Sequence, residues 1–402
     1  MPTLRLAAFA ALALLAATPT RAAPDPGGAP VIRRFDGRPL EAAAIDHEAR
    51  RLMAAAHVNG LAMAVIDGGR VVYVNSWGRR NVEKDLPLQR DTIMYGASIT
   101  KFVFGYMVMQ LVDEGRLDLD KPIKDYLPQP LWMYDDGYYA LLKDDPRWEK
   151  LTLRILLQHS TGFHNFGFFE PDEKVHIHFE PGSRYSYSGE GVILAQRVLE
   201  WGLGLDVEAE MQRRVWDRFG MTRTSLRWRP EWNGNLADGY ALDGSFEPHD
   251  ERSNVRAAGS MDTTIEDLAR FYAGFMPGEG LSPETRTEML RPQLPIRTPS
   301  QFPVLSEAVA PQLARYRLSA ALSVVTFRSK YGLAFFKGGH NEWTGNISIC
   351  VERTKRCVIY LSNDVRAESL FQRLTEATVG DPGMPWSWES YVPYDQARPA
   401  SQ

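Results

Sequence analysis

The chain has 402 residues, of which 44% are hydrophobic and 24% are charged, and its formal net charge at pH 7 is -4. This composition is that of a folded globular protein, long enough to bury a large core in more than one lobe. Because the chain has no excess of basic residues, it lacks the positive electrostatic potential that attracts a nucleic-acid backbone or an anionic membrane surface. We therefore expect no nucleic-acid partner.

Residues 1–23 have the layout of a secretory signal, in which Arg5 precedes an apolar run from Leu6 to Ala17 and small residues follow. The run is too short to span a bilayer after processing, and no later stretch reaches the length of a membrane helix. We therefore expect a secreted or periplasmic protein without a stable membrane span; a retained N-terminal anchor is the alternative. Residues 24–38 are rich in Pro, Gly and Ala and predict a linker before a single domain at residues 39–402.

The first folded elements that we predict are a helix and a hairpin. Apolar residues at helical spacing predict an amphipathic helix between Leu40 and Ala55. Two strands follow, at residues 61–66 and 70–74, and the turn Asp67-Gly68-Gly69 between them suits a tight hairpin. A sheet therefore begins before the chain reaches its next helix.

Ser98 and Lys101 open an apolar helix that continues through residues 102–112. Side chains three residues apart on a helix share one face, so the hydroxyl and the amine lie within reach of each other. An oxyanion formed when Ser98 attacks a carbonyl would meet the unpaired N–H groups of the helix N-terminus. Lys101 must be neutral to accept a proton, which the apolar run behind it favours. The pattern predicts a nucleophile with its own base; the alternative is a helix cap and a solvated lysine.

Five aromatic residues lie in the charged segment at residues 128–150: Trp132, Tyr134, Tyr138, Tyr139 and Trp148. We expect a surface hairpin that packs its own aromatic side chains, and a flap over a cleft is the alternative. Further on, His176 and His178 have the spacing that puts both rings on one face of a strand. Two histidines without a nearby third ligand make a poor metal site, so a zinc hydrolase is disfavoured and we expect no metal.

Tyr187 lies in a loop before a second apolar helix at residues 192–200. A phenol in such a loop can reach into a cleft and pass protons between a nucleophile and a leaving group, although most loop tyrosines are structural. Later in the chain, Thr263 and Glu266 have the spacing of a capping box and predict the start of another helix.

The end of the chain returns to strands, which we expect at residues 319–327, 331–337, 344–351 and 357–361, followed by a helix at about 366–378. The fold class expected is therefore α+β, with an antiparallel sheet flanked by N- and C-terminal helices. Its α/β lobe comprises residues 39–95 and 315–380, and a mostly α lobe of about 96–314 is inserted between them. A cleft at the boundary of the lobes would hold Ser98.

The two cysteines lie in one of these predicted hairpins. A two-residue turn at Arg353-Thr354 would place Cys350 opposite Cys357, with both side chains on one face. An exported protein could oxidise this pair. Because a cross-strand disulfide needs a particular geometry, two buried free thiols are an equal alternative.

Three motifs stand in a fixed order in this chain: Ser98…Lys101, Tyr187-Ser188-Gly189 and Lys337-Gly338-Gly339-His340. With them, the chain from about residue 42 to 379 resembles the serine β-lactamase and penicillin-binding-protein superfamily, closest to class C β-lactamases, D,D-carboxypeptidases of that type and family VIII esterases. The resemblance implies that Ser98 is the acylated nucleophile, that Lys101 accepts its proton, and that Tyr187 takes or relays that proton.

The resemblance also implies a role for the third motif. Its strand would supply a second oxyanion N–H near Gly339 and His340, while Lys337 or His340 meets the polar end of the substrate. Two features depart from the family pattern. Gly189 replaces an asparagine that would hold a substrate carbonyl, and the third motif blends a Lys-Thr-Gly form with a His-x-Gly form.

We therefore expect an exported serine hydrolase that acts through an acyl-enzyme at Ser98, with no metal or organic cofactor. Its substrates would be small esters, amides or peptides, with short-chain esters hydrolysed most readily because the site has few polar anchors. A β-lactamase or a D,D-carboxypeptidase is the alternative within this class. The alternative of another class is a non-catalytic penicillin- or peptidoglycan-binding module, which the loss of the asparagine at Gly189 favours.

Overall fold

The computed structural model describes residues 31–134 and 137–396, so the predicted signal at residues 1–23 lies outside the described residues. Part of the predicted linker is folded. Strand β1 (Ile32–Arg33) pairs with β2 (Pro39–Leu40), and Phe35 is buried, with its backbone N–H bonded to O of Val379. The linker prediction is therefore wrong for this part, because apolar side chains among its small residues find partners at the other end of the chain.

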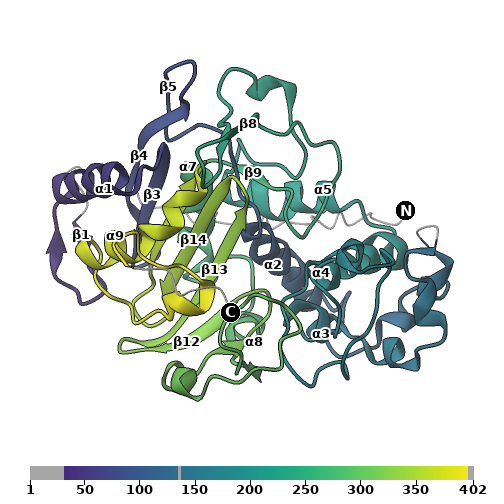
Figure 1. Ribbon diagram of the computed structural model, residues 1–402. Coiled ribbons are helices and arrows are strands. Elements are labelled where there is room, and N and C mark those ends of the chain that lie inside the picture. The colour runs from purple at the N-terminus through teal and green to yellow at the C-terminus, as the bar shows by residue number, and fades with distance from the viewer. Residues whose placement is uncertain (1–30, 135–136, 397–402) are drawn as a thin grey trace, which may run out of the picture. The chain divides into compact units, whose positions relative to one another are not determined.

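An antiparallel sheet is the centre of the fold (Figure 1). Its strands, in spatial order, are β10 (Leu294–Pro295), β11 (Ser319–Ala320), β12 (Val325–Ser329), β13 (Gly332–Asn341), β14 (Thr344–Val351), β15 (Arg356–Ser362), β3 (Gly60–Asp67), β4 (Arg70–Asn81) and β5 (Leu86–Pro87). The predicted hairpin is β3 and β4, and β3 pairs with β15 from the end of the chain. As predicted, N-terminal and C-terminal strands therefore share one sheet.

Three two-stranded pairs complete the strands of the described residues: β1–β2, β6 (Met94–Tyr95) with β9 (Asp262–Thr263), and β7 (Gly239–Tyr240) with β8 (Phe246–Glu247). The helices of the same residues are α1 (Ala42–Ala56), α2 (Ile99–Asp113), α3 (Leu153–Leu157), α4 (Gly189–Arg197), α5 (Val207–Met211), α6 (Asp217–Phe219), α7 (Ile265–Phe275), α8 (Pro283–Leu290) and α9 (Phe371–Ala377). None of these helices is long and apolar enough to cross a bilayer.

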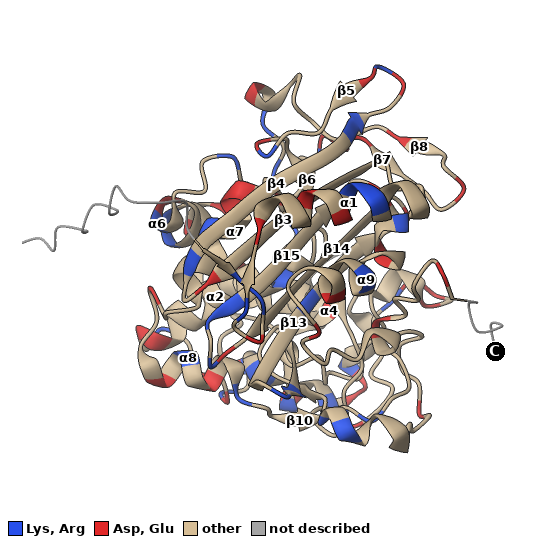
Figure 2. Ribbon diagram, turned by 90° about the vertical axis from the view of Figure 1, so that its left-hand side faces the viewer, with Lys and Arg blue, Asp and Glu red and all other residues tan. Residues whose placement is uncertain are grey.

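The sheet separates two hydrophobic cores. Along β3, Leu61, Met63 and Val65 belong to one core, and the alternate residues Ala62 and Ala64 belong to the other. Helices α1 and α9 cover the first face and lie in front of the strands in Figure 2. Helices α2 and α7 pack on the second face. Because both faces are covered, the central strands β3 and β14 are buried along their whole length.

Several boundaries differ from those predicted. Strand β10 joins the sheet although its residues were assigned to the α lobe, and Trp388, beyond the predicted end of the α/β lobe at residue 380, is buried in the core under α9. The N-cap of helix α7 is Thr264, one residue after the predicted Thr263. Oγ1 of Thr264 accepts a hydrogen bond from the backbone N–H of Asp267 in the first turn.

The aromatic segment at residues 128–150 is not a hairpin. It forms short 3₁₀ turns, and its side chains pack partly on one another and partly on the helical lobe. The rings of Trp132 and Trp148 meet at 5.5 Å, whereas Tyr134 stacks on Trp201 at 4.0 Å, just beyond α4. The segment therefore serves to pack the α lobe.

Candidate active site

The N-terminus of α2 holds the predicted nucleophile and base. Ser98 is the N-cap residue, and Lys101 follows on the first turn, where its Nζ lies 2.9 Å from Oγ of Ser98. Only 1% of Lys101 is exposed, because buried residues surround α2 on every side. Burial, helped by the charge of Lys337, lowers the pKa of Lys101 well below its usual value. This environment favours the neutral amine, which can accept a proton.

Tyr187 approaches the same oxygen from the loop before α4. Its Oη lies 2.8 Å from Oγ of Ser98, and its ring lies 4.6 Å from the ring of His159. The next residue, Ser188, is the N-cap of α4 and accepts a hydrogen bond from N of Gly191, which ties the loop to the helix. Burial raises the pKa of Tyr187, so the phenol keeps its proton at neutral pH and can donate it.

Strand β13 passes directly in front of Ser98. A Cβ atom on Gly339 would lie 2.9 Å from N of Ser98 and 2.8 Å from N of Ile99, so only glycine permits this approach. Residues 337–341 pair with β14 along one edge. On the other edge they have no partner among the described strands, because the pairing with β12 stops at Val325, which lies opposite Phe336. Unpaired backbone groups of the strand therefore lie beside the helix N-terminus, where N–H donors can stabilise an oxyanion.

His340 and Lys337, the two candidates for contact with the polar end of a substrate, differ in their position relative to the cavity. His340 lines the cavity, and its Nδ1 is 3.1 Å from Oε1 of Glu368. Burial opposes the charge of His340, but the Glu368 carboxylate outweighs this effect and raises the pKa of the imidazole. Lys337 is 6% exposed and does not line the cavity; its Nζ donates to O of Gly338 and lies 5.1 Å from the centre of the Tyr187 ring.

A carboxyl group that sequence reasoning missed lies in the same cavity. Glu389 is 5% exposed, and its Oε2 accepts a hydrogen bond of 3.3 Å from Nε2 of Gln301. A Cβ atom on Gly338 would lie 2.9 Å from that oxygen, so the carboxyl group packs on the backbone of β13. Burial raises the pKa of Glu389 and lowers that of Lys337, while each group favours the charged form of the other.

Gly189 stands where the resemblance implies an asparagine, and its surroundings require a small residue. A Cβ atom there would lie 2.5 Å from the ring of Phe166 and 3.1 Å from Oδ1 of Asn165. The same Oδ1 accepts a hydrogen bond of 2.9 Å from N of Gly189. Asn165 and Phe166 line the cavity and Gly189 does not, so the space of a larger side chain at residue 189 is already filled.

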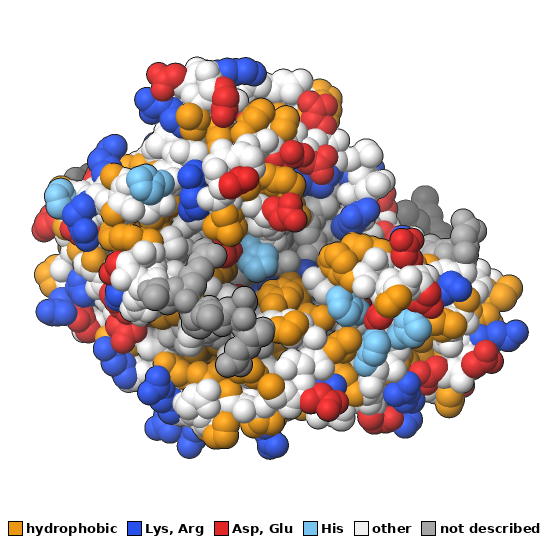
Figure 3. Space-filling view, viewed as in Figure 1, with side chains coloured by type: hydrophobic (Ala, Val, Ile, Leu, Met, Phe, Trp, Pro, Cys, Tyr) orange, Lys and Arg blue, Asp and Glu red, His pale blue; other side chains and the backbone are white. Residues whose placement is uncertain are grey.

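One cavity of about 510 Å³ brings the candidate residues together. Five of them line it: Ser98, Lys101, Tyr187, Gly339 and His340. In Figure 3 a histidine lies in a hollow of this face, with hydrophobic side chains beside and below it and acidic side chains above. Much of the remaining wall comes from loops that the sequence did not mark, within residues 165–169, 247–260 and 301–302.

The aromatic wall of the cavity does not come from residues 128–150. Phe166, Phe168, Phe169 and Phe302 line it instead. A signal for the first three was present in the sequence, as the run Phe-Gly-Phe-Phe at residues 166–169. Apolar residues that cluster without a helical or strand period have no regular element to bury them, and such a cluster can mark a binding surface.

The two histidines at alternate positions contact separate carboxyl groups. Nε2 of His176 lies 2.9 Å from Asp172, and Nε2 of His178 lies 2.6 Å from Glu170. Within residues 31–134 and 137–396, no group of three or more His, Cys, Asp and Glu side chains is arranged to hold a metal ion.

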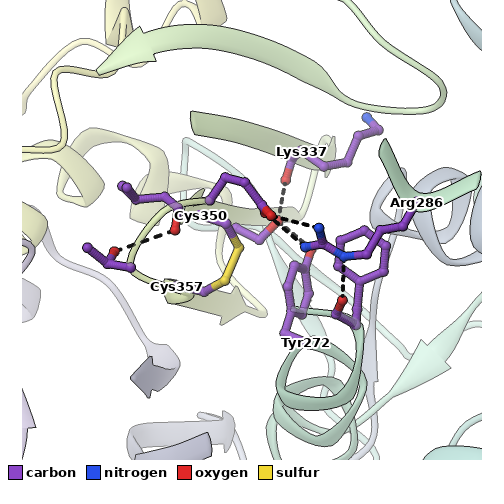
Figure 4. The surroundings of a disulfide bond; sticks show 10 residues. Tyr272, Arg286, Lys337, Cys350 and Cys357 are labelled. Carbon is purple, nitrogen blue, oxygen red and sulfur yellow. Dashed lines mark hydrogen bonds and ion pairs between the residues drawn. A yellow bond between two sulfur atoms is a disulfide. The ribbon is translucent and has the colours of Figure 1, made fainter. Parts of the chain in front are cut away.

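A disulfide crosses the sheet behind the site. Cys350 on β14 lies opposite Cys357 on β15, and the two buried residues are bonded, which is one of the two alternatives that the sequence left open. Figure 4 shows the bridge near Tyr272 and Lys337. Tyr272 donates a hydrogen bond to Oγ of Ser348, which in turn donates to O of Lys337 over 3.4 Å. The bridge joins β14 to β15, and the hydrogen bonds connect α7 and β14 to β13, the strand of the third motif.

We expect the double variant Cys350→Ala/Cys357→Ala to remain folded but to lose about 2 kcal/mol of unfolding free energy. The bridge closes a loop across a sequence separation of 7, and opening such a short loop restores a modest amount of chain entropy to the unfolded state. Urea denaturation of the two proteins measures the difference. Free thiols in the denatured, unreduced wild type, or equal unfolding free energies, would contradict the prediction.

A family model described as "Beta-lactamase" matches residues 45–379 of the chain. The chain is 30% identical over 196 residues to a lovastatin esterase from Penicillium rubens, a match that covers 41% of this chain and 48% of the relative. It is also 30% identical over 203 residues to a monacolin J acid methylbutanoyltransferase from Aspergillus terreus, with 42% of this chain and 48% of the relative covered. The chain thus spans about half the length of these relatives.

Solved structures share the fold. An octameric penicillin-binding protein homologue from Pyrococcus abyssi matches with a TM-score of 0.65 at 22% identity, over 81% of this chain and 74% of that one. A D-alanine carboxypeptidase from Burkholderia cenocepacia matches with a TM-score of 0.63 at 17% identity, over 80% of this chain and 93% of that one. These similarities confirm the predicted α+β fold class.

Proposed function

The chain belongs to the beta-lactamase family, and we propose that it is a serine hydrolase that cleaves small esters or amides through an acyl-enzyme on Ser98. One observation carries the proposal: Oγ of Ser98 lies 2.9 Å from Nζ of Lys101 and 2.8 Å from Oη of Tyr187. A hydroxyl in contact with a neutral amine and a protonated phenol has a base for its own proton and an acid for a leaving group.

The proposed reaction has two halves. Oγ of Ser98 attacks the carbonyl carbon as its proton passes to Lys101, and the N–H groups beside Gly339 meet the negative charge on the carbonyl oxygen. The bond to the leaving group then breaks, the leaving group takes a proton from Tyr187, and Tyr187 regains one from Lys101. In the second half, water gives a proton to the same groups as it attacks the acyl carbon; the bond from that carbon to Oγ then breaks, and Oγ takes this proton, which releases the acid and restores the hydroxyl of Ser98.

We propose simple esters as the first substrate class. Phe166 fills the space beside Gly189, so an amide-bearing substrate lacks one polar anchor, and specificity for amides depends on such anchors. A lactam or D,D-peptide substrate is the second candidate. It is favoured by Asn165, whose side-chain amide lines the cavity next to Gly189.

The proposal is tested by labelling and by a substrate panel. A fluorescent phosphonate should add one adduct at Ser98, as read by intact mass and peptide mapping. The panel comprises p-nitrophenyl esters, a chromogenic cephalosporin and a D-Ala-D-Ala peptide, of which short-chain esters should be hydrolysed readily and the cephalosporin weakly or not at all. Absence of an adduct would favour a non-catalytic binding module. Efficient cephalosporin hydrolysis without esterase activity would favour the second candidate.

We expect His340→Ala to lower the plateau kcat/KM on the order of tenfold, and more than Lys337→Met does, because His340 lines the cavity and Lys337 does not. Lys337→Met should instead move the acid limb of the pH profile to higher pH. The charge of Lys337 lowers the pKa of Lys101, so its removal lets Lys101 stay protonated to a higher pH. pH profiles of kcat/KM check both effects, and a greater plateau loss in Lys337→Met would assign the substrate contact to the lysine.

We also propose that the protein is exported to the periplasm or the medium. The pattern at residues 1–23 supports this, as does the disulfide between Cys350 and Cys357, since such bonds persist mainly in oxidising compartments. The mass of the protein recovered from periplasm should lack residues 1–23. A protein retained in the cytoplasm at full mass would contradict the proposal.

A further inference from the structure

Three phenylalanine rings form an exposed cluster beside the nucleophile. Phe168 is 50% exposed and Phe169 is 57% exposed, although both line the same cavity as Ser98. The ring of Phe168 stacks on that of Phe166 at 5.0 Å and meets that of Phe169 at 4.7 Å. Large apolar side chains that are exposed together, next to polar catalytic groups, form a surface that gains free energy when an apolar group covers it.

The cluster is held in place by packing and by hydrogen bonds. N of Gly167, between the rings, donates to Oε2 of Glu190 on α4 over 3.3 Å, and Oη of Tyr138 donates to the same oxygen over 2.7 Å. A Cβ atom on Gly167 would lie 2.7 Å from Oη of Tyr138. The absence of a side chain at Gly189 lets the ring of Phe166 lie against the start of α4. The rings are therefore preformed as a wall and need not be ordered by a ligand.

The cluster occupies a defined place relative to the nucleophile. Phe302 also lines the cavity, with its ring 5.5 Å from that of Tyr187 and 5.6 Å from that of His340. Phe166 and Phe168 line a second cavity of about 490 Å³ as well, so their rings border two neighbouring hollows. Because the second cavity is lined mostly by charged and polar side chains such as Glu200 and Arg227, an apolar chain would lie against the rings within the cavity of Ser98.

We propose that Phe166, Phe168 and Phe169 form a subsite for an alkyl or aryl group of the ester substrate. Among the esters that it hydrolyses, the enzyme would thus favour those with an apolar part of several carbons over acetate esters of small alcohols. This inference rests on the function proposed above. The apolar group can belong to the acyl part or to the alcohol part of the ester, and the two arms of the test distinguish them.

The test compares wild type with Phe168→Ala and Phe169→Ala, two exposed positions where truncation leaves little buried volume empty. The first arm measures kcat/KM for p-nitrophenyl acetate, butyrate and octanoate, and the second for ethyl, butyl and hexyl acetates. In one arm, wild-type kcat/KM should rise with chain length. In that arm, each variant should reduce the ratio of long-chain to short-chain kcat/KM on the order of tenfold, while kcat/KM for the shortest ester of the arm changes less than about twofold.

Phe246→Ala is the matched control, because Phe246 is a 42% exposed phenylalanine that lines neither cavity. It should leave every ratio unchanged. A second readout needs no turnover: if the first arm shows the chain-length effect, a phosphonate with a hexyl group on phosphorus should inactivate wild type faster than one with a methyl group, and Phe168→Ala should remove most of this difference.

Two outcomes separate the subsite from the function on which it rests. If wild type hydrolyses esters and is labelled at Ser98, but both variants keep the wild-type chain-length ratios, the subsite is overturned and the function stands. If wild type neither hydrolyses any ester nor reacts with either phosphonate, both are overturned. An equal loss on acetate and on long chains would also reject the subsite, because it indicates damage to the catalytic groups.

Discussion

Ser98→Ala is expected to lower kcat/KM for every ester or amide substrate on the order of 10³-fold or more, and to abolish labelling by a phosphonate. The variant removes the atom that forms the acyl-enzyme, and no neighbouring group replaces a nucleophile. The loss should fall on kcat, since the walls of the cavity that bind the substrate remain. Steady-state kinetics and intact mass after labelling measure the two effects.

The fold should survive this substitution, because it removes one oxygen whose partners, Lys101 and Tyr187, keep other contacts. Lys101 also donates to O of Ala258, and the Tyr187 ring packs on His159. An unchanged thermal midpoint is therefore the control. Retention of most activity in Ser98→Ala would reject the assignment of the nucleophile.

Lys101→Ala should be nearly as severe, on the order of 10³-fold in kcat/KM, because among the described side chains Ser98 then keeps only the protonated phenol of Tyr187 as a hydrogen-bonding partner. Lys101→Arg should fail equally. A guanidinium stays protonated and cannot accept the serine proton, although it preserves the positive charge. Slow phosphonate labelling of both variants would confirm the loss at the acylation step. Rescue by arginine would show that charge, not basicity, is what Lys101 supplies.

The burial of Lys101 also predicts how kcat/KM depends on pH. The neutral amine of Lys101 is the active form, so kcat/KM should rise with pH through an acid limb as Lys101 loses its proton. Because burial lowers the pKa of Lys101, the midpoint of this limb should lie well below the usual lysine value, and the enzyme should be active at neutral pH. A limb centred near the value of a solvated lysine would contradict a buried base.

The contact between Ser98 and Lys101 could be predicted from sequence because its geometry is local. Ser98 and Lys101 lie one helical turn apart, and any helix that begins at Ser98 brings their polar atoms together. The same holds for Cys350 and Cys357, since the symmetry of a hairpin about its turn sets which residues face each other. Of the two alternatives for this pair, only the folded sheet decided for the disulfide.

The fold class was also within reach of the sequence. The hairpin of β3 and β4 and the C-terminal strands are apolar runs bounded by turn residues, and the long helical segment between them predicted an inserted lobe. The errors lie at element boundaries and at the ends of the chain. Phe35 and Trp388 sit in segments without periodicity, so their burial depends on distant partners that no local pattern reveals.

The sequence by itself thus determined the contact between Ser98 and Lys101 and the strands of the sheet, which depend on short-range spacing and on the periods of helix and strand. Only the tertiary structure decided what lines the cavity. It brought His340 into the lining and buried Lys337 beside the ring of Tyr187, placed Glu389 beside β13, and filled the space at Gly189 with Phe166. These choices rest on contacts between segments far apart in the chain, since side-chain packing in a cavity depends on the shape of every wall and not on one stretch of residues.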